Sequence, residues 1–243
     1  MFRHRGKSRT YIHNLRLASI LSLIAGMVNI CGVLSVKTLT TNITGHFAYF
    51  AEELFNKHYA GAIIFLMFIL CFLLGAFVSN ILVEIVSRIK PRISHAYPMI
   101  IEILILSIVG IFGYRSEMSN LGSQFIACAL LFAMGLQNAL VTKVSHSTVR
   151  TTHLTGLFTD LGIELSQLFF YRNPIELQKL SRSIYLRLII IVFFFIGCVL
   201  GGFLFMIFKL KTLLFASSCL VVALFYDTIR YRFYLYKRKM LSR

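Results

Sequence analysis

Threonine and glycine recur in one polar pattern, Thr-Thr-x-x-Thr-Gly, that occurs once in each half of the chain. The first copy spans residues 40–45 and the second spans residues 151–156. A Glu-Leu pair follows each glycine at the same distance, beginning at Glu53 and at Glu164. A hydroxyl-rich segment broken by glycine, placed inside very apolar sequence, is typical of a binding site in a membrane protein. The pattern therefore predicts a site that both halves of the chain help to build.

Several kinds of group in these segments can bind a ligand. Threonine hydroxyls coordinate ligands or satisfy backbone groups at a helix break, and glycine lets a backbone or ligand approach closely. Free N–H groups at the start of a helix attract anions, and free carbonyl groups attract cations. Close helix packing and helix capping are the alternative roles of the threonines and glycines. The predicted substrate-binding residues are Asn29, Thr41, Asn42, Thr44, Gly45, Asn138, Thr152, His153, Thr155 and Gly156.

Carboxylates follow the second copy at a four-residue step, so a helix would carry Asp160 and Glu164 on one face with Gly156. The corresponding face of the first copy ends at Glu53 and has Tyr49 in place of the aspartate. A charge at the centre of a bilayer costs at least about 2.5–3.5 kcal/mol, so a carboxylate there is a candidate for function. We predict Asp160, Glu164 and Glu53 as sites of proton or cation coupling, with a solvated or ion-paired position at the membrane surface as the alternative.

The remaining polar residues give no sign of catalysis or of a cofactor. Glu84 and Glu102 lie near the ends of apolar runs, which predicts positions at the membrane surface. The five cysteines lie inside apolar runs without metal-ligand spacing, so we expect them to be small packing residues. No nucleophile, phosphate-binding or metalloprotease pattern occurs, and the sequence predicts neither an enzyme nor a bound cofactor or metal.

The composition predicts an integral membrane protein that forms one membrane domain over residues 1–243. Hydrophobic residues make up 58% of the 243 residues, and the mean hydropathy is +0.79. The net charge is +16, but most basic residues flank apolar runs, which favours anionic lipid headgroups over nucleic acid. The expected partners are the lipid bilayer and an unidentified small solute or ion, and no nucleic acid. A homo-oligomer is left open.

Apolar runs of about 20 residues separate the polar segments and are long enough to cross a bilayer. The polar segments 37–57 and 142–171 are predicted to be interrupted or re-entrant, and the basic stretch 172–187 to lie at the membrane surface. The first apolar run is longer than that of a signal peptide and lacks a clear cleavage site, which predicts an uncleaved helix. The expected transmembrane helices span residues 17–36, 60–86, 98–114, 121–141, 188–208 and 213–229.

The predicted fold class is an all-α polytopic membrane protein of about six transmembrane helices. Most of the 25 lysines and arginines fall on the side of the N-terminus when six helices cross, which predicts that both termini are cytoplasmic. Three crossings in each half give the halves opposite orientations, so we expect inverted repeats over about 17–114 and 121–231. A Gly-x-x-Asn pattern precedes each motif, and a shorter match pairs Gly75 with Gly201.

These segments together resemble the signature segments of a known family, the YoaK-like bacterial membrane proteins. The matching segments are residues 26–29, 41–45, 135–138 and 150–156. The resemblance covers most of the chain and implies a multi-pass protein of the bacterial inner membrane with about six helices and no established function. Two positions depart from the family pattern: Asn29 stands where the family often has aspartate, and His46 where it often has asparagine.

We predict a small secondary transporter or permease whose polar site forms where the two Thr-Thr-x-x-Thr-Gly segments meet. One alternative is a channel with two re-entrant elements, which would conduct without saturation or ion coupling. Another is a non-transporting scaffold or lipid-binding protein, in which the motif only packs helices and encloses no cavity. The sequence does not identify the substrate.

Overall fold

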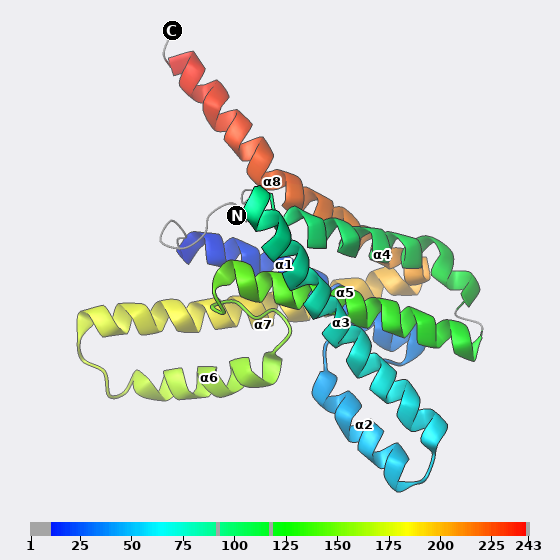
Figure 1. Cartoon of the computed structure of the whole chain (residues 1–243). Coiled ribbons are helices and arrows are strands. Elements are labelled where there is room, and N and C mark those ends of the chain that lie inside the picture. The colour runs from blue at the N-terminus through cyan, green and yellow to red at the C-terminus, as the bar shows by residue number, and fades with distance from the viewer. Residues whose placement is uncertain (1–10, 91–92, 117–118, 242–243) are drawn as a thin grey trace.

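Long α-helices make up nearly all of the chain that is described. The structure is a computed structural model that describes residues 11–90, 93–116 and 119–241, so the basic residues before position 11 lie outside the described part. No strand occurs within these ranges, which confirms the all-α class. The helices are α1 (Tyr11–Val36), α2 (Ile43–Phe55), α3 (Tyr59–Ile89), α4 (Ala96–Ser116), α5 (Asn120–Ser145), α6 (Leu154–Gln167), α7 (Pro174–Phe208), the 3-10 turn η2 (Lys209–Lys211) and α8 (Thr212–Leu241) (Figure 1).

Several of these helices are long and apolar enough to cross a membrane. Their outer faces expose large apolar side chains, among them Leu73 and Phe77 of α3 and Phe195 and Phe203 of α7, which suits contact with lipid. Within the described residues the five candidate membrane-spanning stretches are Tyr11–Val36, Tyr59–Ile89, Ala96–Gly113, Leu121–Ser145 and Pro174–Tyr226. The last of these stretches contains α7, η2 and the first part of α8.

The two polar segments each contain one short helix. Helix α2 has 13 residues and α6 has 14. At 1.5 Å per residue each is about 20 Å long, which is too short for a hydrocarbon core of about 30 Å. Helix α2 packs against α3 and α6 packs against α7, and Figure 1 shows the two short helices lying at different ends of the bundle.

Glycines bring α1 and α7 into backbone contact. A Cβ added at Gly26 of α1 would overlap the carbonyl oxygen of Phe194 on α7. A Cβ at Gly197 of α7 would overlap the carbonyl oxygen of Leu23 on α1. Cys198 adds a hydrogen bond across the same contact, from its Sγ to the carbonyl oxygen of Gly26 at 3.4 Å. Small residues facing each other are what allows membrane helices to approach this closely.

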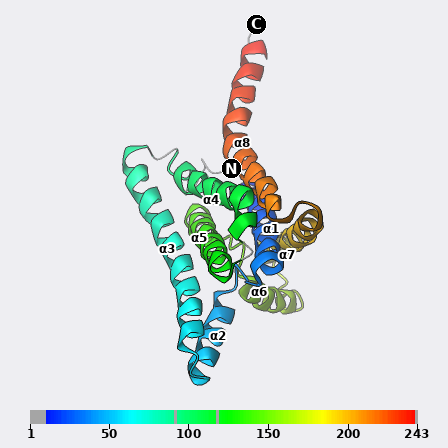
Figure 2. The same ribbon diagram turned by 90° about the vertical axis from the view of Figure 1, so that its right-hand side faces the viewer.

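The α3–α5 pair repeats this contact. A Cβ at Gly135 of α5 would overlap the carbonyl oxygen of Phe72 on α3, and one at Gly75 of α3 would overlap that of Phe132 on α5. In each pair, the helix before one motif packs on the helix after the other motif. Figure 2 shows α3 and α7 on opposite sides, with α5 and α1 between them.

These reciprocal contacts correct the alignment of the two halves. Gly26 corresponds to Gly135, as the Gly-x-x-Asn pattern predicts. Gly75, however, corresponds to Gly197 and not to Gly201, because the first two make the same contact with a carbonyl oxygen. The sequence match to Gly201 was wrong because it rested on the neighbouring pair Gly201-Gly202. The helix contacts instead involve a Phe-x-x-Gly pattern that both α3 and α7 contain, ending at Gly75 and at Gly197.

Helix α7 begins well before its apolar run, so the expected surface stretch 172–187 is mostly helical. Asn173 caps the helix, since its Oδ1 accepts a hydrogen bond from the N–H of Ile175 at 3.0 Å. Pro174 occupies the first turn, as does Glu176, whose charge suits the N-terminal end of the helix dipole. These local signals start the helix where hydropathy alone does not.

The glycine contacts predict that a glycine-to-alanine substitution lowers the stability of the protein at a contact glycine and raises it slightly at a glycine without neighbours. Gly26→Ala should force α1 from α7 and destabilise the protein by about 1–3 kcal/mol, as overpacking does. Gly162→Ala is the matched control, because nothing lies within 4 Å of a Cβ there and the change should stabilise α6 slightly. Thermal unfolding of the detergent-solubilised protein, followed by circular dichroism, measures both. Equal melting temperatures for the two variants would contradict the packing account.

Candidate functional site

Asn29 of α1 holds the first motif segment in place. Its Oδ1 accepts hydrogen bonds from Thr41 Oγ1 at 3.0 Å and from the backbone N–H of Thr40 at 3.1 Å. The side chain of Thr40 is buried, with its methyl group facing Gly32. The amide thus satisfies polar groups that the chain frees where it leaves α1, which a membrane interior requires.

Asn138 of α5 plays the same role for the second segment. Its Oδ1 accepts hydrogen bonds from Thr152 Oγ1 at 2.7 Å and from Thr151 Oγ1 at 3.5 Å. Thr151 is fully buried, like its counterpart in the first motif. The first two residues of each motif are therefore fixed by an amide on the preceding long helix.

The glycine that ends each motif makes room for a capping residue. Asn42 caps α2, and its Oδ1 accepts a hydrogen bond from the N–H of Gly45 at 3.1 Å. His153 is the N-cap of α6 without a side-chain cap bond, and its ring lies over Gly156, where a Cβ would overlap it. The Thr-Gly step thus lets a polar side chain fold over the first turn of each short helix.

The two motif segments meet at one cavity of about 870 Å³. Both segments and both asparagines contribute to its wall. Of the predicted binding residues only Gly156 does not line it, because the ring of His153 covers that position. The predicted residues that line the cavity are Asn29, Thr41, Asn42, Thr44, Gly45, Asn138, Thr152, His153 and Thr155.

Sequence reasoning missed four important lining residues. Phe72 of α3 and Phe194 of α7 line the cavity from corresponding positions, and the same residues receive the glycine contacts of the long helices. The repeated Phe-x-x-Gly pattern was the available signal. Thr142 and Arg150, which flank the second motif, complete the polar wall and have no counterpart in the motif itself.

The cavity wall combines hydroxyls, amides and the starts of two helices. Helices α2 and α6 both begin at the cavity and run away from it, since α6 lines it only with its first turn and α2 with its first turn and Ala48. Their N-terminal ends carry partial positive charge, and Arg150 adds a full one. No carboxylate occurs among the described lining residues. This chemistry suits an anionic or neutral polar solute better than a metal ion.

Two further cavities adjoin the first. One, of about 560 Å³, shares Asn138 and Thr142 with it and is also lined by Lys143 and His146 at the end of α5. The other, of about 170 Å³, shares Asn42 with it. Its lining residues include Lys37, directly after α1, and His46 of α2. The shared residues place these two cavities beside the motif cavity, at the C-terminal ends of α5 and α1.

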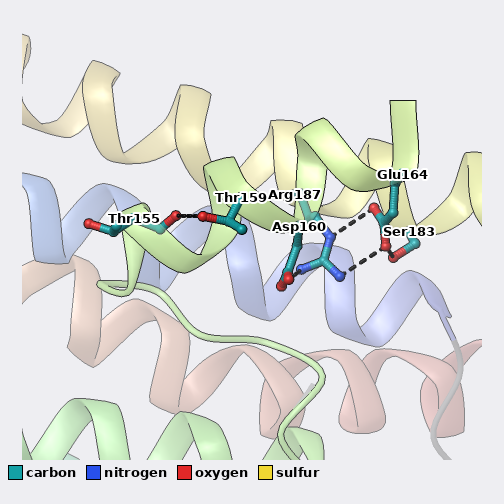
Figure 3. Close-up of polar contacts among 6 residues, drawn as sticks. All are labelled: Thr155, Thr159, Asp160, Glu164, Ser183 and Arg187. Carbon is teal, nitrogen blue, oxygen red and sulfur yellow. Dashed lines mark hydrogen bonds and ion pairs between the residues drawn. The ribbon is translucent and has the colours of Figure 1, made fainter. Parts of the chain in front are cut away.

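The predicted coupling carboxylates of α6 are ion-paired outside this cavity. Arg187 of α7 donates from Nε and Nη2 to the two oxygens of Glu164 at 2.8 and 2.9 Å, and from Nη1 to Asp160 Oδ2 at 2.8 Å. Ser183 Oγ donates to Glu164 Oε1 at 2.6 Å. Figure 3 shows Arg187 between the two carboxylates, with Thr155 farther along α6. The face of α6 that carries Asp160 and Glu164 therefore does not line the cavity, and these two carboxylates join α6 to α7. Their coupling role stays a prediction.

The other acidic residues differ from expectation in one case. Glu53 also lies away from the cavity, with its Oε2 3.5 Å from His58 Nδ1. Glu84 pairs with Lys143 and is half-exposed, consistent with the predicted surface position. Glu102 was predicted to lie at the membrane surface; it is buried within the protein, with 1% of the residue exposed, and its depth in the membrane stays a prediction. Packing of α4 against its neighbours buries it, which its place in the sequence does not indicate.

A scan against protein-family models matches residues 17–226 to the family described as Protein of unknown function (DUF1275). The chain belongs to this family. The match spans both motifs, both asparagines and all four contact glycines, so the DUF1275 family model covers the whole cavity. No match was found among curated proteins or among solved structures.

The Arg187 ion pairs predict that α6 depends on α7 for its order. Arg187→Met should lower the free energy of local opening of α6 by about 1.5–3 kcal/mol, the range for hydrogen bonds to charged groups. Amide hydrogen exchange in α6 should then speed up roughly 10- to 100-fold, while α2 is unchanged. Lys179→Met, which removes an exposed cation from the same helix, is the control. Unaltered exchange in α6 of the Arg187 variant would show that the ion pairs do not hold it.

Proposed function

We propose that this protein is a small secondary transporter or permease built from two inverted repeats. The observation that carries the proposal is the cavity that both motif segments line with corresponding residues. Paired short helices that begin at such a cavity are the usual construction of a site between inverted repeats. The reciprocal glycine contacts of α1 with α7 and of α3 with α5 support a two-fold relation between the halves.

The adjoining cavities support a path for a solute through the protein. Lys37 and His146 occupy corresponding positions, each directly after a long helix that precedes a motif, and each has a left-handed backbone conformation. The space at the His146 end is larger than that at the Lys37 end, 560 against 170 Å³. These unequal volumes favour a conformation that opens toward the end of α5. With both termini in the cytoplasm of a bacterial inner membrane, that end would face inward.

The alternatives fit the same features less well. A scaffold whose motifs only pack helices has no use for a cavity of 870 Å³ with a polar wall. A channel needs a continuous open path, whereas the cavity beside Lys37 has a volume of only about 170 Å³. The lining groups favour a small solute with carboxylate, phosphate or hydroxyl groups.

Uptake by the reconstituted protein tests the proposal directly. The full chain in liposomes is offered labelled inorganic phosphate, acetate, succinate and glycine, with empty liposomes as blank. We expect saturable uptake of at least one compound and faster uptake when the same compound is present inside, because a carrier exchanges its solute. Uptake that rises linearly with concentration would indicate a channel, and no uptake of any compound would favour a scaffold.

One matched pair of variants tests the site. Thr155→Val removes a hydroxyl that lines the cavity, and Thr159→Val removes one turned to the carbonyl oxygen of Thr155 at 3.0 Å. Loss of a ligand hydrogen bond of about 1.5 kcal/mol lowers transport roughly tenfold. We therefore expect about tenfold slower uptake for Thr155→Val and little change for Thr159→Val. Equal rates for the two variants would remove the motif cavity from the transport path.

A further inference from the structure

Glu102 is a buried acidic residue in the first half of α4. Its helix, α4, packs against α3, α5, η2 and α8. The residues one turn away on the same face, Met99 and Leu106, are fully buried, and Glu102 itself is 1% exposed. This carboxyl group is thus in an apolar setting inside a stretch that can cross a membrane.

Among the side chains that the structure describes, no positive charge pairs with this carboxyl group. Its Oε1 is buried and has no hydrogen-bond partner. Among the described residues, no ion pair joins it to a cation of the four elements that pack against α4. Three of the other acidic residues discussed above do have a cationic partner, Arg187 for Asp160 and Glu164 and Lys143 for Glu84, and Glu53 lies 3.5 Å from His58. In those four elements and in α4 itself, the titratable side chains that the structure describes are, besides Glu102, Tyr59, Cys71, Glu84, Arg88, Tyr97, Cys128, Lys143, Lys209, Lys211, Cys219 and Tyr226.

A second buried side-chain oxygen without a hydrogen-bond partner belongs to Gln137 of α5, which packs against α4. A Cβ at Gly113 of α4 would lie 3.7 Å from Ile126 of α5, which fixes the register of this antiparallel helix pair. Counting the same distance along each helix, about 16 Å, leads to Glu102 on α4 and to Gln137 on α5. Gln137 is 1% exposed, and its Oε1 also lacks a hydrogen-bond donor.

A buried carboxyl oxygen without a hydrogen-bond partner, in a carboxyl group that no described cation approaches, is most simply accounted for by a proton on Glu102. An unpaired carboxylate in an apolar interior costs several kcal/mol, and such a group takes up a proton instead. We propose that Glu102 is a proton-binding residue, held as a neutral carboxylic acid in this conformation, whose proton is exchanged with water during transport. Only the coupling to transport rests on the proposed function; the protonation of Glu102 does not.

Helix α5 connects α4, which carries Glu102, with the cavity. Gln137 Nε2 donates to the carbonyl oxygen of Leu21 on α1 at 2.8 Å, which ties α5 to α1. The next residue, Asn138, holds Thr152 in the cavity wall. A movement of α5 that changes the cavity therefore changes the surroundings of Glu102 as well. In the step itself the carboxyl oxygen gains a proton from water on one side and returns it to water on the other, and no other bond changes.

Infrared spectroscopy of the full chain in lipid tests the protonation. At neutral pH the wild type should show the carbonyl band of a protonated carboxylic acid, shifted in heavy water. Glu102→Gln should lose this band, and Glu52→Gln, which changes an exposed glutamate of α2, should keep it. A wild type without the band, or a band that persists in Glu102→Gln, would overturn the proposal. The wild-type spectrum decides even if the Glu102 variant does not fold.

Transport assays then test the coupling, with the labelled panel compound that the wild type exchanges. At a pH difference of about one unit, one proton per solute sustains roughly a tenfold concentration ratio. We expect the wild type and Glu52→Gln to accumulate the compound and Glu102→Gln to lose accumulation while still exchanging it at equilibrium. Accumulation by Glu102→Gln equal to that of the wild type would overturn the coupling. Failure of the wild type to move any compound would instead defeat the proposed function.

Discussion

The hydrogen bonds from threonines to Asn29 and Asn138 are the interactions on which the rest of the site depends. Each long helix before a motif ends at a turn with a left-handed residue, and the chain then enters a helix too short to cross a bilayer. Such a break frees backbone groups that lipid cannot satisfy. The asparagine accepts from the first threonines of the motif and fixes the turn, so that two short helices start beside one cavity.

Close helix packing places the two breaks opposite each other. The helix after one motif meets the helix before the other at reciprocal glycines, Gly26 with Gly197 and Gly135 with Gly75. Because a Cβ at any of these positions would overlap a carbonyl oxygen, the helix separation is set by backbone contact. The phenylalanines that receive these contacts, Phe72 and Phe194, also line the cavity. Packing and binding therefore share residues, which ties the shape of the cavity to the positions of the long helices.

Charge is distributed very unevenly around this frame. The carboxylates of α6 are paired with Arg187, and no described acidic side chain lines the motif cavity. Glu102, by contrast, is buried, and no described cation pairs with it. The proposed solute site and the proposed proton-binding residue would thus both adjoin α5, which lines the cavity with Asn138 and packs against the helix of Glu102. Separation of this kind lets a solute and a proton bind without competing for the same groups.

The sequence by itself determined the helical class, the apolar stretches long enough to cross a membrane and the polar half of the cavity wall, because hydropathy and a repeated motif are local signals. It also marked α2 and α6 as irregular, since their polarity excludes contact with lipid. It could not distinguish the surface carboxylates from the buried one. Asp160, Glu164 and Glu102 all occur in apolar surroundings along the chain, and only tertiary packing decides that Arg187 reaches the first two while α4 buries the third. The match of Gly75 to Gly197 was likewise decided by contact between helices distant in sequence, which no local pattern contains.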